Sequence, residues 1–151
     1  MITEMAGTAA VPVPGAASGG TATVLVVEDD VLLRAAITGH LRGRGLVVLE
    51  AASAEEALDL LRTPAVRVVF TDVLLDGPLT GADLARSIRR EHPQVEVLLT
   101  SAVPDEAKGD LEGITLLAKP YRLFQVEHHL QELLSRSQRE QATEDGGRAA
   151  G

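Results

Sequence analysis

The sequence predicts an α/β fold in which helices cover both faces of a parallel sheet. Five short apolar runs alternate along the chain with segments of helical periodicity, which is the pattern of strands joined by crossover helices. Several of these runs end in charged or hydroxyl side chains. The carboxyl ends of parallel strands share one edge of the sheet, and ligands bind at that edge. We therefore expect carboxylates, a hydroxyl and an ammonium from distant parts of the chain to meet there.

Each expected strand is a run of five or six residues rich in valine, leucine or isoleucine. The first run ends in the acidic residues 28–30, the third in Asp72, the fourth in Thr100 and Ser101, and the fifth in Lys119. Runs this short and rich in branched residues favour strands over helices. The five strands are expected at residues 23–28, 46–50, 66–71, 95–99 and 114–118.

The expected helices are bounded by glycine, proline and capping residues. The first ends at Gly43 and Gly45, because glycine stops helices. Ser53 and Glu56 have the spacing of a capping box and open the second helix, which ends near Pro64. Proline suits a first helical turn, and the last helix carries a single apolar stripe. The helices are expected at residues 31–43, from Ser53 to about Pro64, at 81–91, in a short segment opened by Pro104, and at 121–136.

Right-handed crossovers between five parallel strands leave few possible topologies. The flavodoxin-like (βα)5 order 2-1-3-4-5 places the switch point, where ligands bind, between the first and third strands. Those two strands end in Asp29 and Asp72. The position of the acidic residues therefore agrees with the doubly wound parallel sheet that the strand and helix pattern predicts.

Length and composition indicate one globular domain with an aliphatic core. Of the 151 residues, 45% are hydrophobic but only 2% are aromatic. A net charge of −8 argues against direct nucleic-acid binding, and the lack of cysteine excludes disulfides and thiolate metal sites. No apolar run could span a membrane, and the first basic residue, Arg34, comes too late for a secretory signal, so we expect a cytoplasmic protein. Residues 1–21 and 138–151 have the composition of disordered tails around a folded domain at 22–137.

Four segments of the chain resemble the signature segments of the receiver domain of two-component response regulators. They occur in the order and spacing of that family, and the resemblance covers about residues 23–137. One such segment alone is a weak signal, whereas all four together are highly specific. The segments are residues 24–30 (VLVVEDD), 70–73 (FTDV), 98–102 (LLTSA) and 117–120 (LAKP).

The resemblance implies that Asp72 accepts a phosphoryl group from a phosphohistidine of a partner kinase and forms an acyl phosphate. It implies that Thr100 hydrogen-bonds a phosphoryl oxygen and that Lys119 pairs first with Asp72 and then with the phosphoryl group. The protein would then be no enzyme beyond catalysing its own phosphorylation and dephosphorylation. A Mg²⁺ ion is also implied, because hard cations take oxygen ligands. Its expected ligands are Asp29, Asp72, Glu28 through a water molecule, and the backbone carbonyl of Leu74.

Several positions around the expected site carry expectations of their own. Leu116 stands where many receivers have an aromatic residue, so the usual aromatic rotation cannot occur in the fifth strand. The loop after Asp72 is slightly lengthened and contains Asp76, which we expect at the loop surface. Asp30 is expected to cap the first helix rather than bind metal, and Tyr121 is expected at the surface. The resemblance also implies a cis bond between Lys119 and Pro120.

No effector module follows the last expected helix, so we expect a stand-alone receiver that acts through protein contacts or within a phosphorelay. The expected partners are a sensor histidine kinase or histidine phosphotransfer protein, a downstream protein, and a second copy bound through the fourth helix, fifth strand and fifth helix. One alternative is a receiver-like binding module that signals without phosphorylation, which Leu116 and the unusual loop after Asp72 favour. The four retained site residues disfavour it, namely Asp29, Asp72, Thr100 and Lys119. Another is a Mg²⁺-dependent phosphohydrolase or nuclease, but residues 28–30 lack the Asp-x-Asp spacing of such enzymes.

Overall fold

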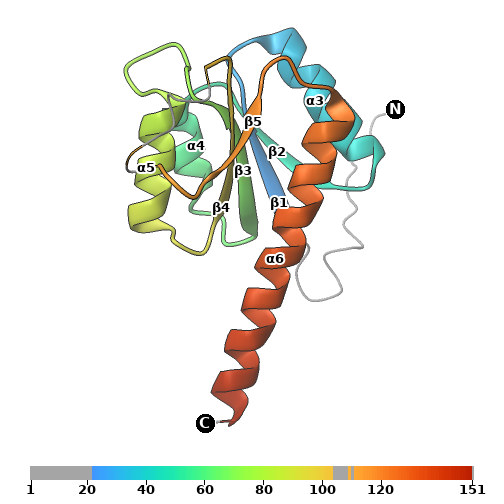
Figure 1. Cartoon of the computed structure of the whole chain (residues 1–151), viewed down its shortest axis with the longest axis vertical. Helices are drawn as coiled ribbons and strands as arrows, with labels where there is room; N and C mark the ends of the chain where they lie inside the picture. The colour runs from blue at the N-terminus through green and yellow to red at the C-terminus, as the bar shows by residue number, and fades with distance from the viewer. Residues whose placement is uncertain (1–21, 104–108, 110, 151) are drawn as a thin grey trace, which may run out of the picture.

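The computed structural model describes residues 22–103, 109 and 111–150, and it contains the predicted five-stranded sheet (Figure 1). The strands lie in the order β2-β1-β3-β4-β5, and every neighbouring pair is parallel. The predicted strand order is therefore confirmed. The strands are β1 (Thr23–Val27), β2 (Val47–Ala51), β3 (Val66–Asp72), β4 (Glu96–Ser101) and β5 (Thr115–Ala118).

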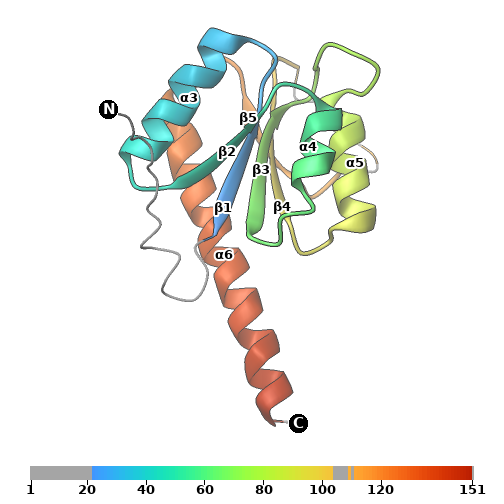
Figure 2. The same ribbon diagram turned by 180° about the vertical axis from the view of Figure 1, so that it is seen from behind.

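Helices α3 and α6 cover one face of the sheet, and α4 and α5 cover the other (Figures 1 and 2). The fourth helix of the predicted (βα)5 pattern, expected to open at Pro104, falls on residues outside the described part of the chain. The described residues therefore contain five strands and four helices. None of these helices is both long enough and apolar enough to span a membrane. The helices are α3 (Val31–Gly43), α4 (Ala54–Leu60), α5 (Gly81–Glu91) and α6 (Leu123–Ala150).

The central strands contribute alternate residues to two apolar layers. All five residues of β1 are buried. Val24 and Val26 belong to the layer under α3 and α6, whereas Leu25 and Val27 belong to the layer under α4 and α5. A parallel sheet covered on both faces requires such continuous apolar strands, which explains why the strands were recognisable in the sequence.

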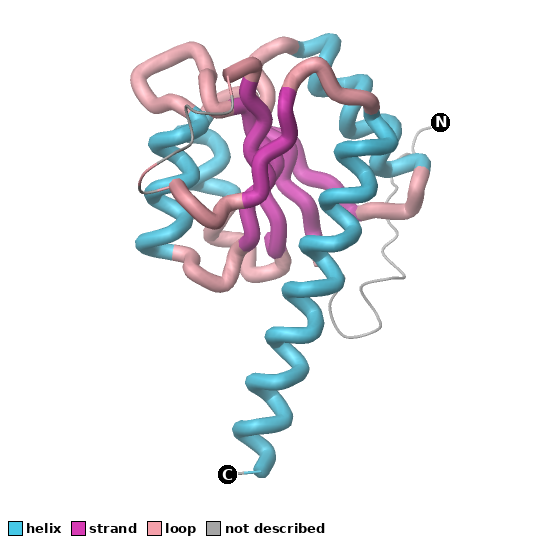
Figure 3. The backbone as a smooth tube through the Cα atoms, in the orientation of Figure 1, coloured by secondary structure: helices cyan, strands magenta, loops and turns pink. Residues whose placement is uncertain are grey.

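The carboxyl ends of the inner strands lie level at one edge of the sheet. Val27 of β1 pairs with Thr71 of β3, and Asp72 pairs with Thr100 of β4. Ser101 of β4 pairs with the last residue of β5. Figure 3 shows the loops that follow β1, β3 and β5 at the top of the molecule. The register thus places the predicted site residues along one edge.

Helix α6 extends further than the sequence analysis predicted. We expected a helix to about residue 136 and a disordered tail from 138, but the helix continues to Ala150. Its second half projects away from the sheet (Figure 1), and the side chains of residues 138–143 are exposed. Residues 138–142 (QREQA) favour helix formation, yet they form no apolar stripe, so the pattern of hydrophobic residues gave no sign of a helix there.

Candidate functional site

The ends of β3 and β5 bring together two of the predicted site residues, Asp72 and Lys119. The ammonium Nζ of Lys119 contacts carboxylate Oδ2 of Asp72, although 47 positions separate the two residues. The other carboxylate oxygen, Oδ1, accepts a hydrogen bond from the backbone N–H of Leu74 at 2.9 Å. The side chains of Asp72 and Lys119 are 14% and 34% exposed, so a reagent can reach the ion pair from solvent. The expected Asp72–Lys119 contact and the cis bond before Pro120 are both confirmed.

Asp29, just beyond β1, is fixed by the loop that follows β3. Its Oδ2 accepts a hydrogen bond from the backbone N–H of Asp76 at 2.8 Å. That bond is the main reason why the pKa of Asp29 lies below its usual range, so the carboxylate is held in its ionised form. Asp76 is exposed in the loop, as expected, and its backbone N–H is in addition part of the site. Any non-proline residue could supply this N–H, so the side chain gave no signal in the sequence.

Glu28 is the buried member of the acidic pair, with 8% of its surface exposed. Burial, and to a smaller extent interactions with Asp29 and the charge of Asp72, raise the pKa of Glu28 to about 6. The backbone N–H of Asp30 opposes this shift by donating to Oε2 of Glu28 at 3.0 Å. Asp29 and Asp72 therefore both disfavour the ionised form of Glu28.

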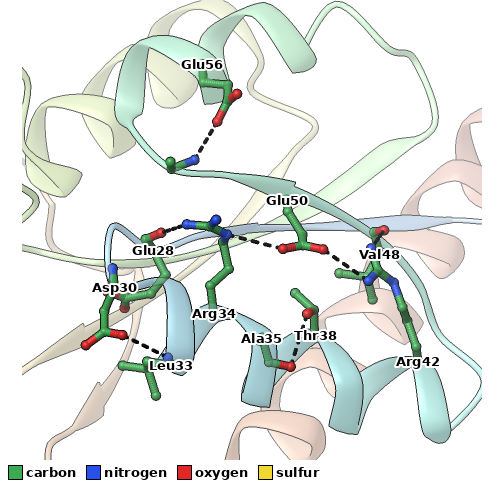
Figure 4. A network of polar contacts seen from close by, with 11 residues as sticks. Glu28, Asp30, Leu33, Arg34, Ala35, Thr38, Arg42, Val48, Glu50 and Glu56 are labelled. Atoms are coloured by element: carbon green, nitrogen blue, oxygen red, sulfur yellow. Dashed lines mark hydrogen bonds and ion pairs between the residues drawn. The ribbon is translucent and has the colours of Figure 1, made fainter.

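The first turn of α3 is anchored beside Glu28 (Figure 4). Asp30 caps the helix, because its Oδ1 accepts the backbone N–H of Leu33 at 3.0 Å, as the sequence predicted. Arg34 donates to the backbone carbonyl of Glu28 at 2.7 Å and to Oε1 of Glu50 on β2 at 3.2 Å. The end of β1 is therefore tied to both α3 and β2, which restricts where Asp29 can lie.

Two hydroxyl side chains lie at the end of β4. Thr100, which the sequence analysis selected, is 2% exposed and pairs in register with Asp72. Paired residues of neighbouring strands project from the same face of a sheet, so Thr100 and Asp72 are side by side. Ser101 lies one residue further along the strand and is 1% exposed. Its hydroxyl donates to the carbonyl of Val103 at 2.7 Å and accepts the N–H of Val103 at 3.0 Å.

The chain's tyrosine, Tyr121, lies just after Pro120. Its ring meets the ring of Phe70 edge to face, with centroids 6.1 Å apart. Burial, followed by the charges of Glu28 and Asp72, raises the pKa of Tyr121 to about 12. Tyr121 is partly buried and packs against the apolar layer under α3 and α6, rather than lying at the surface as expected. Leu116 is partly buried and packs against the apolar layer under α4 and α5.

The donor set around Asp72 fits a Mg²⁺ ion in its chemistry. Mg²⁺ takes oxygen ligands and needs only one or two carboxylates, because waters and phosphate oxygens complete its coordination. Asp29 and Asp72 offer those carboxylates, and Asp29 is held ionised. Within the described part of the chain, no three acidic or histidine side chains are already arranged as a metal cage. In this structure the carboxylate oxygens of Asp72 contact Lys119 and the N–H of Leu74. An oxygen of Asp29 accepts the N–H of Asp76.

Comparison with known proteins gives the class to which this fold and site belong. The family described as "Response regulator receiver domain" matches residues 24–130. The chain therefore belongs to the receiver domain family of two-component response regulators. Receiver domains are signalling phosphoacceptors that generally bind Mg²⁺ at the phosphorylation site and interact with sensor kinases.

Particular relatives show how widely this domain is combined with other segments. The chain is 32% identical over 124 residues to the sensor kinase CckA of Brucella abortus, covering 78% of this chain and 13% of CckA. It is 31% identical over 126 residues to the probable transcriptional regulatory protein TcrX of Mycobacterium tuberculosis, covering 80% of this chain and 53% of TcrX. The crystal structure of the receiver domain of NtrX from Brucella abortus matches with a TM-score of 0.67 and 27% identity, covering 74% of this chain and 98% of that domain. The chain thus spans about half or less of these two curated relatives.

Proposed function

We propose that Asp72 is the residue of this receiver domain that accepts the phosphoryl group. The observation that carries the proposal is the contact between the Asp72 carboxylate and the Lys119 ammonium. An acidic residue after a buried strand is often only a turn residue. Here a lysine that follows β5, two strands away in the sheet, reaches that carboxylate, and β4 between them ends in hydroxyl residues. Such a convergence from three strands supports a site for a phosphoryl group.

In the proposed transfer, a carboxylate oxygen of Asp72 attacks the phosphorus of a phosphohistidine. The new phosphorus–oxygen bond forms as the phosphorus–nitrogen bond to the donor imidazole breaks, and the imidazole nitrogen keeps the electron pair. Lys119 then exchanges its contact with the carboxylate for one with a phosphoryl oxygen. Phosphoryl transfer needs mainly positioning and charge neutralisation from the protein, and this arrangement supplies both. The domain would catalyse only its own phosphorylation and dephosphorylation.

The proposed Mg²⁺ ligands are those that the sequence analysis selected. Asp29 and Asp72 would hold the ion directly, Glu28 would act through water, and the carbonyl of Leu74 would complete the protein's share. When bound, Mg²⁺ neutralises charge on the phosphoryl oxygens. The hydroxyl that binds a phosphoryl oxygen is proposed to be Thr100, and Ser101 is its rival because it lies further toward the end of the strand.

The proposed phosphoryl donor is a sensor histidine kinase or a histidine phosphotransfer protein. Large apolar side chains are exposed on the first turns of α3 and α6, which follow the carboxyl ends of β1 and β5 at the edge carrying Asp72. Leu32 on α3 is 82% exposed and Phe124 on α6 is 62% exposed. Apolar side chains beside a charged site support docking of another protein there. Output would follow through protein contacts, including contact with a downstream target or with a second copy through β5 and α6.

The test is intact-mass spectrometry after incubation with Mg²⁺ and a small acyl phosphate, comparing the wild-type protein with Asp72→Asn. Asp59→Asn is the matched control, since the Asp59 side chain on α4 is 79% exposed and remote from the sheet edge. We expect one phosphoryl adduct on the wild type and on Asp59→Asn, removable with hydroxylamine, and none on Asp72→Asn.

An adduct that persists on folded Asp72→Asn would overturn the assignment. If the folded wild type takes no adduct from the small donor, the same comparison is repeated with phosphorylated histidine kinases. Failure there as well would leave the phosphorylation-independent binding module, an alternative that the comparisons do not support.

A further inference from the structure

The first residue of α5, Gly81, lies directly against the backbone of Asp72. A Cβ atom placed on Gly81 would be 1.6 Å from the carbonyl oxygen and 2.7 Å from the carbonyl carbon of Asp72. Real Cβ atoms essentially never come within 3.0 Å of such atoms. By contrast, a Cβ on Gly39 or Gly43, which also lie in a helix, would meet nothing within 4 Å. Among the glycines that the structure describes, only Gly81 would place a Cβ within 3.0 Å of another atom.

The other neighbours of this contact are fixed as well. The hydroxyl of Thr71, a residue 1% exposed, donates to the same Asp72 carbonyl at 3.1 Å and would lie 3.2 Å from a Cβ on Gly81. The N–H of Ala82 donates to the carbonyl of Val73 at 3.1 Å, which joins α5 to the exit of β3. Neither side of the contact can therefore move away alone.

The start of α5 is also held by a capping box. The N–H of Asp83 donates to the Thr80 hydroxyl at 3.1 Å, and the N–H of Thr80 donates to Asp83 Oδ2 at 3.0 Å. These bonds satisfy backbone donors at the helix start and fix its first turn. A side chain at position 81 would therefore push on the Asp72 peptide rather than bend the helix freely.

We propose that Gly81, together with Thr71, is a positioning residue for phosphoryl transfer to Asp72. This inference rests on the proposed function of Asp72. Relieving the overlap from 1.6 Å to at least 3.0 Å requires a displacement of about 1.4 Å, and the atom in the way belongs to the backbone. Such a displacement would disturb both carboxylate contacts, the one from Lys119 and the one from the N–H of Leu74. A misplacement of about 1 Å can cost roughly 100-fold in rate.

The experiment compares Gly81→Ala with Gly39→Ala in the full chain. The rate of Asp72 phosphorylation by a small acyl phosphate is measured against donor concentration, by intact mass, with Mg²⁺ present. We expect Gly81→Ala to lower the maximal rate constant roughly 100-fold with little change in the donor concentration for half-maximal rate. Gly39→Ala should react at the wild-type rate. Partial unfolding alone could cause such a loss only if about 99% of the molecules were unfolded, which circular dichroism detects.

Two further results decide the outcome. Thr71→Val, which keeps the shape of the side chain but removes the hydroxyl, should also lower the maximal rate constant, by a smaller factor than Gly81→Ala. If Gly81→Ala does not fold, Thr71→Val decides alone, and an unchanged rate constant overturns the proposal. A wild-type rate for folded Gly81→Ala also overturns it. A wild type that takes no adduct contradicts the proposed function instead, so the two failures are distinguishable.

Discussion

Asp72 and Asp29 are oriented largely by backbone groups of the loop that joins β3 to α5. The N–H of Leu74 holds Asp72 Oδ1, and the N–H of Asp76 holds Asp29 Oδ2. Side chains at positions 74 and 76 are not needed for these bonds, so the loop can vary in sequence while the carboxylates stay in place. Side-chain identity matters instead at Lys119, which contacts Asp72 directly, and at Gly81, where no side chain fits.

The two hydroxyls at the end of β4 can be separated by substitution at the residue scale. If Thr100 binds a phosphoryl oxygen, Thr100→Val should lower the phosphorylation rate roughly 10- to 100-fold, because hydrogen bonds to charged groups are worth about 1.5–3 kcal/mol. Ser101→Ala should then be nearly silent. The measurement is the rate of adduct formation from a small donor. The opposite ranking would transfer the role to Ser101.

At the scale of elements, α3 and α6 present exposed apolar residues at the edge that carries Asp72. Leu32→Ser should lower the rate of phosphoryl transfer from a kinase roughly tenfold, since an apolar contact of this size is worth about 1.5–3 kcal/mol when fully buried. The rate with a small acyl phosphate should not change, because that donor needs no docking surface. Val47→Ser, at the start of β2 and 43% exposed, is the control far from this edge. Equal losses with both donors would show that Leu32 acts on the site rather than on docking.

The same two helices are joined at the other end of α3 through Glu127 of α6. Its carboxylate accepts a hydrogen bond from His40 Nε2 at 3.0 Å and another from Arg44 Nε at 2.9 Å. These bonds, with His40 the larger contributor, lower the pKa of Glu127 below its usual value. A carboxyl group whose pKa is lower in the folded state than in the unfolded state stabilises the fold at pH values above its unfolded-state pKa. That stabilisation is lost as the pH falls through the folded-state pKa.

Glu127→Gln should therefore unfold at a lower temperature than the wild type at neutral pH. The difference should shrink in acid, once Glu127 is protonated in both folded and unfolded wild type. The difference in unfolding temperature is measured by circular dichroism at a series of pH values between about 3 and 8. Glu132→Gln serves as the control, because Glu132 is 66% exposed and its contact with His128 of the same helix is longer, at 3.7 Å. A destabilisation of Glu127→Gln that is the same at all pH values would contradict this account.

At the scale of the whole molecule, burial determined how much could be predicted from sequence. The strands and their order were predictable because both faces of the sheet are covered, which forces apolar runs such as residues 24–27. The meeting of Asp72 and Lys119 followed from the shared strand edge. The bond from the Asp76 backbone and the approach of Gly81 depend on loop geometry, which side-chain patterns do not encode. The distal half of α6 buries no described side chain beyond Ser137, so no periodicity marked it.

Ending the chain after Ser137 should leave the stability of the domain almost unchanged. The described side chains of residues 138–143 are all exposed, and exposed side chains away from special features contribute little. We expect the free energy of unfolding in urea to change by less than about 1 kcal/mol. A loss of more than about 2 kcal/mol would show that the distal half of α6 packs against another part of the molecule.

The aromatic pair beside the site makes the protein its own optical reporter. Tyr121 is the only tyrosine of the chain, and the sequence contains no tryptophan. When the protein is excited at a wavelength that phenylalanine does not absorb, all intrinsic emission therefore originates from one ring, packed edge to face on Phe70 and two residues from Lys119. A change in the charge at Asp72, or a movement of Lys119, alters the surroundings of that ring. Binding of Mg²⁺ and phosphorylation can thus be followed in unlabelled wild-type protein by tyrosine fluorescence alone.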